Sequence, residues 1–181
     1  MTLQFSLDKN DYLQHQLYIA STSKTIKKKR IKSWLTTTLI FFVLGLFSSQ
    51  TDNIFLTYYF FIFSIITLIF FPFYQRYRYK KHYQKFINEN YKNRFGEEIN
   101  VSFEEKTIET FDISGELKIN HSSLEKITET SSYIFLKVKT GGTLIIPKDK
   151  ITKKDELKTK LQSLAQKIKI DYSLALDWEW K

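Results

Sequence analysis

The residues that could do chemistry are few in this 181-residue chain, and they stand far apart. Its three histidines, His15, His82 and His121, lie in separate regions without the close ligand spacing of a zinc site. The chain has no cysteine, which excludes a thiol nucleophile, a disulfide scaffold and the usual kinds of zinc finger. We therefore expect neither a bound metal nor another cofactor.

Acidic pairs and a glycine pair offer the other chemical possibilities. Glu97-Glu98 and Glu104-Glu105 suggest acid–base work, but neighbouring residues on a strand point to opposite faces and do not converge on one substrate. Gly141-Gly142 lacks the following Lys-Ser/Thr and helix of a phosphate-binding loop, so it predicts a hairpin turn. The sequence thus predicts a protein that is not an enzyme.

Two apolar segments dominate the first half of the chain. Charge is absent from Trp34 to Thr51, and Asp52 is the only charged residue before Arg76. This pattern argues against a wholly soluble domain and predicts a transmembrane hairpin over residues 34–74, with helices at 34–50 and 54–74. At 1.5 Å per residue the second segment spans about 32 Å, enough for a hydrocarbon core of about 30 Å. The few polar residues between the segments require antiparallel helices.

Basic residues flank the apolar region on both sides. Residues 24–32 carry six Lys and Arg without an acid, and residues 75–94 carry seven against Glu89. By the positive-inside rule, both termini of a multi-pass protein of the plasma membrane would be cytoplasmic. Residues 95–181 hold 14 Lys against 15 acids, so no basic surface for nucleic acid is expected there.

The hairpin is expected to continue into the cytoplasm at both ends. Residues 1–33 predict a strand at Thr2–Leu7 and a juxtamembrane helix that Asp8 caps. Residues 75–95 predict an extension of the second helix, which Gly96 would stop. Pro72 would kink that helix near its inner end.

From Glu97 the hydrophobic period changes to two, which predicts an antiparallel β meander in a domain over residues 96–181. Thr152 to Asp155 resembles a capping box, and an amphipathic helix after it would close the domain. The whole chain is therefore predicted to be an α+β membrane protein. The six expected strands are Ile99–Phe103, Thr107–Phe111, Glu116–Ile119, Leu124–Thr130, Tyr133–Val138 and Thr143–Ile146.

Two short motifs follow the hairpin, GELKINHSSL at Gly115–Leu124 and TLIIPK at Thr143–Lys148. This layout resembles the bacterial YcxB-like membrane protein family, in which a glycine, an "I-x-W-x-x-I"-like step and a late "I-P-K" recur. His121 stands where that family usually has tryptophan. The resemblance covers nearly the whole chain in layout. It implies a membrane location and a C-terminal domain related to the pleckstrin-homology (PH) fold, and it supplies no catalytic residues.

The functional hypothesis is a membrane-anchored module whose cytoplasmic PH-like domain binds a protein segment or a lipid headgroup. Its expected partners are the bilayer, including anionic headgroups, and a protein or a second copy of the chain. The alternative is a small transport-related or immunity-type membrane protein that acts through its oligomerised hairpin, with Gly45 and Thr36–Thr38 allowing close packing. Candidate headgroup or partner contacts are Lys137, Lys139, Lys148, Lys150, Trp178 and Trp180.

Overall fold

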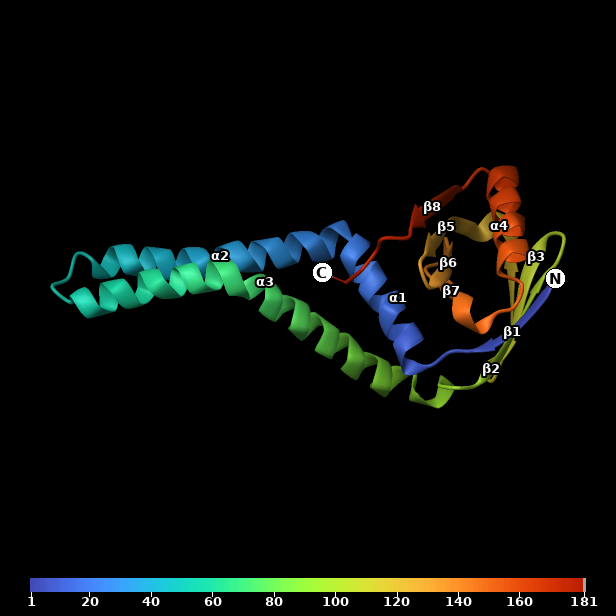
Figure 1. Cartoon of the computed structure of the whole chain (residues 1–181), viewed down its shortest axis with the longest axis horizontal. Coiled ribbons are helices and arrows are strands. Elements are labelled where there is room, and N and C mark those ends of the chain that lie inside the picture. Colours follow the sequence, from blue (N-terminus) through green and yellow to red (C-terminus); the bar gives the residue numbers. More distant parts are fainter. Residues whose placement is uncertain (181) are drawn as a thin grey trace. The chain divides into compact units, whose positions relative to one another are not determined.

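The computed structural model describes residues 1–180, and the chain is α+β with two compact units (Figure 1). The sheet unit comprises residues 1–15 and 86–179 and contains all the strands among the described residues. The helical unit comprises residues 16–85 together with Trp180.

The first sheet of the sheet unit has four antiparallel strands in the order β1-β2-β3-β4. The amino-terminal segment supplies β1, which pairs with β2 so that Leu3 lies opposite Val101. This confirms the prediction that the alternating run at the start of the chain adds a strand to the sheet. The strands are β1 (Thr2–Ser6), β2 (Glu98–Phe103), β3 (Thr107–Asp112) and β4 (Gly115–Asn120).

The second sheet has the order β7-β6-β5-β8, so the predicted antiparallel meander is not continuous but is divided between two sheets. A 3₁₀ turn at His121–Ser123 separates β4 from β5, and the two strands belong to different sheets. Strand β8 runs parallel to β5, which is possible because a helix provides the long crossover that parallel strands need. The strands are β5 (Leu124–Thr130), β6 (Tyr133–Val138), β7 (Thr143–Pro147) and β8 (Asp171–Ala175).

The crossover is α4 (Lys154–Ile168), which confirms the predicted closing helix. The capping box is wrong, because the N-cap is Lys153 and no side chain caps the helix there. Lys169 ends α4 with a left-handed backbone at φ 57°, and the N–H of Ile170 donates to the Ala165 carbonyl. One face of α4 joins both sheets in the core, whose fully buried side chains include Val101, Ile108, Leu124, Ile127, Leu136, Ile146, Leu157 and Leu161.

The helical unit is built from α2 (Lys24–Ser48) and α3 (Ile54–Asn90), with the last part of α1 (Lys9–Thr22) before them. Ser23 separates α1 from α2 and caps α2 by accepting a hydrogen bond from the Ile26 N–H. The basic residues 24–32 therefore form the first turns of the apolar helix itself rather than the end of the preceding helix. Both α2 and α3 are long and apolar enough to cross a membrane.

Helices α2 and α3 lie side by side and pack closely at Gly45 (Figure 1). A Cβ atom at Gly45 would lie 2.9 Å from the ring of Phe61, so only glycine fits this contact without a shift. Phe42 contacts the same ring edge-on, with 5.7 Å between the ring centroids. The predicted close packing at Gly45 thus occurs within one chain.

A proline shapes the second half of the hairpin. Pro72 has no N–H and leaves the carbonyl of Leu68, four residues earlier, without its helical donor. The indole Nε1–H of Trp34 on α2 donates to that carbonyl at 3.1 Å. Figure 1 shows α3 bending part-way along its length, and Pro72, the only proline in the helix, supplies the physical cause.

Helix α3 extends beyond the apolar segment, as predicted, and ends at Asn90. A 3₁₀ turn follows at Lys92–Arg94, and Gly96 then adopts φ +77° while its N–H donates to the Leu7 carbonyl. The predicted stop at Gly96 is therefore wrong, because α3 ends before it, although the positive φ of Gly96 is a conformation that residues other than glycine rarely adopt.

Candidate functional site

Two of the predicted contact lysines, Lys137 and Lys139, lie on β6 and just after it. The Nζ atom of Lys137 forms an ion pair with Glu125 at 2.7 Å, and both side chains are about half exposed. Lys139 donates to the carbonyl of Ser122, also at 2.7 Å. Each ammonium group therefore has a partner within the sheet unit.

Lys150 belongs to a network at the start of α1. Its Nζ atom lies 2.7 Å from Asp11 and 3.1 Å from Asp8, and the buried Tyr133 hydroxyl donates to Asp11 at 3.0 Å. Asp8 also caps α1 as predicted, because its carboxylate accepts from the N–H groups of Asn10 and Asp11. Burial acts to lower the pKa of Lys150, but its hydrogen bonds with the two carboxylates outweigh burial and raise it. Lys150 is thus a cation that links the 3₁₀ turn at Lys148–Lys150, which follows β7, to the start of α1.

Lys148 belongs to a second network, centred on the carboxylate of Glu129. Lys148 lies 2.8 Å from Glu129, Lys158 lies 3.4 Å away, and the Tyr172 hydroxyl donates to the carboxylate at 2.7 Å. Burial acts to raise the pKa of Glu129, but these hydrogen bonds and positive charges outweigh it and lower the pKa. Glu129 is therefore ionised in the folded protein at neutral pH.

The structure divides the four lysines between separate partners and does not gather them into one open cationic surface. Lys137 and Lys139 pair with Glu125 and the Ser122 carbonyl, while the other two join two distinct carboxylate networks. Three of the four ammonium groups face a carboxylate within the sheet unit, and that of Lys139 faces a backbone carbonyl. This placement favours a structural role for them over contact with an anionic headgroup.

The two candidate tryptophans lie beyond β8, which ends at Ala175. The N–H of Trp178 donates to the Ala175 carbonyl. Trp180 is 7% exposed and packs within the helical unit, where its indole N–H donates to the Arg76 carbonyl at 3.3 Å. The guanidinium carbon of Arg30 lies 5.1 Å from its ring centroid.

An open groove of about 460 Å³ lies between the first sheet and the β6–β7 hairpin. Leu117 on β4 lines it and is 58% exposed, although Ile119, on the same face of the strand, is only 7% exposed. The core of the sheet unit is therefore uncovered at Leu117. The opposite wall comes from Val138, Thr140, Gly142, Thr143 and Leu144.

Strand β4 is also an edge of its sheet, because it pairs only with β3 among the described strands. Its outer backbone N–H and C=O groups are available to another extended chain. The predicted hairpin turn on the other wall is confirmed, with Gly141 at φ +99° and a hydrogen bond from the Val138 N–H to the Gly142 carbonyl. An open edge beside an uncovered apolar side chain is the arrangement that accepts an added strand.

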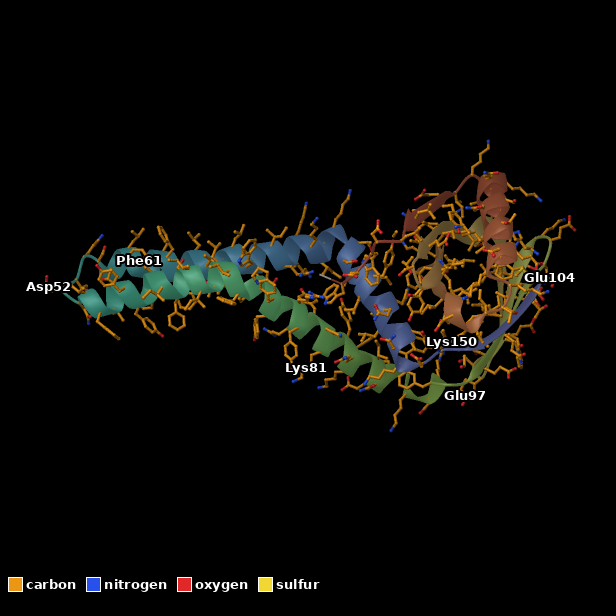
Figure 2. All side chains as sticks on the ribbon, in the orientation of Figure 1. Asp52, Phe61, Lys81, Glu97, Glu104 and Lys150 are labelled. Carbon is orange, nitrogen blue, oxygen red and sulfur yellow. The ribbon has the colours of Figure 1, made fainter. Side chains whose placement is uncertain are left out.

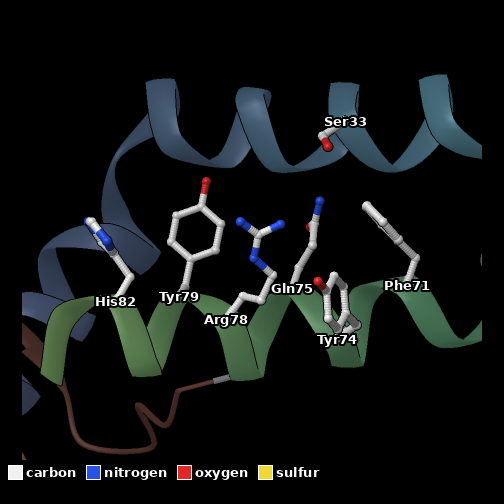
Figure 3. Close-up of a pocket in the computed structure, with 7 residues that line it drawn as sticks. All are labelled: Ser33, Phe71, Tyr74, Gln75, Arg78, Tyr79 and His82. Atoms are coloured by element: carbon white, nitrogen blue, oxygen red, sulfur yellow. The ribbon is translucent and has the colours of Figure 1, made fainter. Parts of the chain in front are cut away.

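The helical unit has a different cavity, of about 360 Å³, between α3 and α2. Figure 3 shows Gln75, Arg78 and Tyr79 extending from α3 toward α2, where Ser33 lies opposite. We refer to this cavity as the interhelical pocket. It is lined by Ser33, Phe71, Tyr74, Gln75, Arg78, Tyr79 and His82.

Neither cavity was predicted from the sequence, although the residues that line one of them show a recognisable local spacing. The α3 residues of the interhelical pocket recur at spacings of three and four, which places them on one helix face. The groove at Leu117 depends on how two sheets diverge, and no local pattern reports that.

The histidines do not form a site. His15 packs against Phe135 with 5.3 Å between ring centroids, and His121 lies in the 3₁₀ turn before β5. Among residues 1–180, no group of three His, Asp or Glu side chains is placed to hold a metal ion. Comparisons of the chain with protein-family models, with curated proteins and with solved structures find no match.

Proposed function

We propose that this protein is a non-enzymatic, membrane-anchored binding module. Helices α2 and α3 would form the transmembrane hairpin, and the sheet unit would be a cytoplasmic domain of the PH-like, YcxB-like type. The apolar length of the two helices and the basic residues at their outer ends support this arrangement.

The ligand that the sheet unit fits best is an extended protein segment added to β4. The observation that carries this proposal is Leu117, an inward-facing side chain that remains 58% exposed beside an unpaired strand edge. A bound segment would hydrogen-bond to β4 and place an apolar side chain against Leu117.

Two other possibilities have less support. A lipid headgroup bound to the sheet unit would need free cations, yet the predicted contact lysines already have partners there. A function through an oligomerised hairpin would use Gly45 between copies, yet Gly45 is occupied by Phe61 of the same chain. A protein ligand for the sheet unit is therefore the better hypothesis.

The membrane topology can be tested with single cysteines, because the chain has none of its own. Gln50→Cys lies in the exposed turn after α2, and Glu105→Cys lies in the exposed turn between β2 and β3. A membrane-impermeant maleimide should label Gln50→Cys in intact cells and Glu105→Cys only after permeabilisation. Labelling of Glu105→Cys in intact cells would contradict a cytoplasmic sheet unit.

The binding site can be tested by crosslinking in cells with a photoreactive residue at Thr143, inside the groove. We expect a recurrent protein adduct, and we expect Leu117→Lys to remove most of it by placing a charge in the apolar contact. Leu174→Lys is the matched control, because Leu174 is also 58% exposed but lies on β8, outside the groove. Adducts only to lipid, or equal loss with both variants, would contradict the proposal.

A further inference from the structure

Charge in the helical unit is distributed very unevenly. Residues 16–85 carry 11 Lys and Arg against one acid, Asp52. Figure 2 shows Asp52 in the loop that joins α2 to α3, while Lys81 lies toward the opposite end of the hairpin. All of the basic residues belong to the first turns of α2 or to the part of α3 after Pro72. The interhelical pocket lies between these two basic segments.

The pocket changes from apolar to basic along α3. Phe71 lines the end nearest the apolar segment, Gln75 lies in the middle, and Arg78 and His82 line the end in the basic segment. Figure 3 shows this sequence of side chains along one side of α3. Such a gradient matches an amphiphile, with an apolar chain at one end and an anionic group at the other.

Arg78 is the residue best suited to hold that anion. Its guanidinium carbon lies 5.6 Å from the Tyr74 ring centroid, which orients the side chain, and it has no acidic partner within residues 1–180. A guanidinium presents a planar fork of donors that fits two oxygens of one phosphate. Gln75 donates to the Arg30 carbonyl at 3.1 Å and so fixes α2 beside the pocket.

A second cavity repeats this pattern on the same pair of helices. It measures about 230 Å³, and its lining runs from Lys27 and Arg30 to Trp34 and Pro72, with Gln75 shared between the two cavities. The basic-to-apolar gradient is therefore a property of both sides of the helix pair, not of one side chain.

We propose that the interhelical pocket binds the phosphate headgroup of an anionic phospholipid, with Arg78 as the principal phosphate ligand and Phe71 beside the acyl chains. This proposal rests on the membrane anchoring proposed above. A free phosphate ion would use only the basic end, whereas a phospholipid uses the whole gradient. The strong positive charge of the helical unit favours anionic over zwitterionic lipid.

Native mass spectrometry of the full chain, released from detergent micelles, can test the proposal. Equal amounts of phosphatidylglycerol and phosphatidylcholine are added, and the lipid that stays bound is counted. We expect preferential retention of phosphatidylglycerol and about a tenfold loss of that preference in Arg78→Gln. Lys81→Gln is the matched control, since it removes the same charge from exposed α3 surface outside the pocket. In Lys81→Gln the preference for phosphatidylglycerol should fall by no more than about fivefold, which is the general contribution of one surface cation.

Three further arms separate the possible outcomes. Arg78→Lys keeps the charge without the fork and should retain part of the preference, which a merely misfolded variant would not. Equal losses of the lipid preference in Arg78→Gln and Lys81→Gln would contradict a specific site and would indicate that anionic lipid is attracted by the overall positive charge. Displacement of the lipid by millimolar inorganic phosphate would contradict a phospholipid ligand and would indicate that the pocket binds a free anion. The cysteine labelling above reports membrane anchoring independently, so its failure is distinguishable from failure of the lipid site.

Discussion

Glu129→Ala is expected to destabilise the sheet unit by about 3–5 kcal/mol, the usual cost of breaking a buried ion pair. The Glu129 side chain is 3% exposed and pairs with Lys148 and Lys158 while accepting from the Tyr172 hydroxyl. Its removal leaves the largely buried ammonium group of Lys148 without a carboxylate, with only the Thr130 carbonyl as acceptor, and leaves the Tyr172 hydroxyl without its acceptor. Strands β5, β6 and β8 should therefore become easier to open, because Glu129 lies on β5 between β6 and β8.

Hydrogen–deuterium exchange on the full chain in detergent measures this cost in the sheet unit directly, from the protection of β5 and β6 amides. Glu125→Ala is the matched control. Its ion pair with Lys137 has nearly the same length, 2.7 Å against 2.8 Å, but it is about half exposed. Loss of this pair should cost less than about 1 kcal/mol. Similar losses of protection in the two variants would contradict a special role for the Glu129 network.

The sheet unit is also expected to lose about 2–3 kcal/mol of stability as the pH falls from about 6.5 to about 4. Burial lowers the pKa of His15 to about 4, and its Nε2 atom is buried without a hydrogen-bond partner. In the unfolded chain, histidine has its ordinary pKa of about 6.5. Between these two values the unfolded chain binds a proton that the folded chain does not, so acid favours unfolding.

His15→Leu should remove most of this slope, because leucine keeps an apolar contact with Phe135 and cannot be protonated. The measurement is the protection of β5 and β6 amides at several pH values, corrected for the intrinsic exchange rate. His121, whose pKa burial also lowers, should leave a smaller residual slope. His82→Gln, a change in the exposed part of α3, should retain the wild-type slope. A full slope in His15→Leu would show that another group controls the acid response.

Local patterns in the sequence determined most of the secondary structure. Alternation of apolar and polar residues placed all six predicted strands, and uncharged length placed the two apolar helices. The hairpin turn at Gly141 was predictable because a positive φ is easiest for glycine, whereas α3 ends at Asn90, before the predicted stop at Gly96. Such signals depend on neighbouring residues, so a single sequence contains them in full.

The tertiary structure alone decided the division into two sheets, the parallel pairing of β8 with β5, and the partners of the candidate site residues. Lys150 meets Asp11 across 139 positions, and Trp180 meets the Arg76 carbonyl across 104. The sequence therefore identified Lys148, Lys150 and Trp180 as notable residues without revealing that each is engaged inside the protein. Leu117 shows the converse: its strand was predicted, but its exposure depends on two sheets that diverge there. Periodicity specifies which face of an element is apolar, whereas only the packing of distant elements decides whether that face is covered.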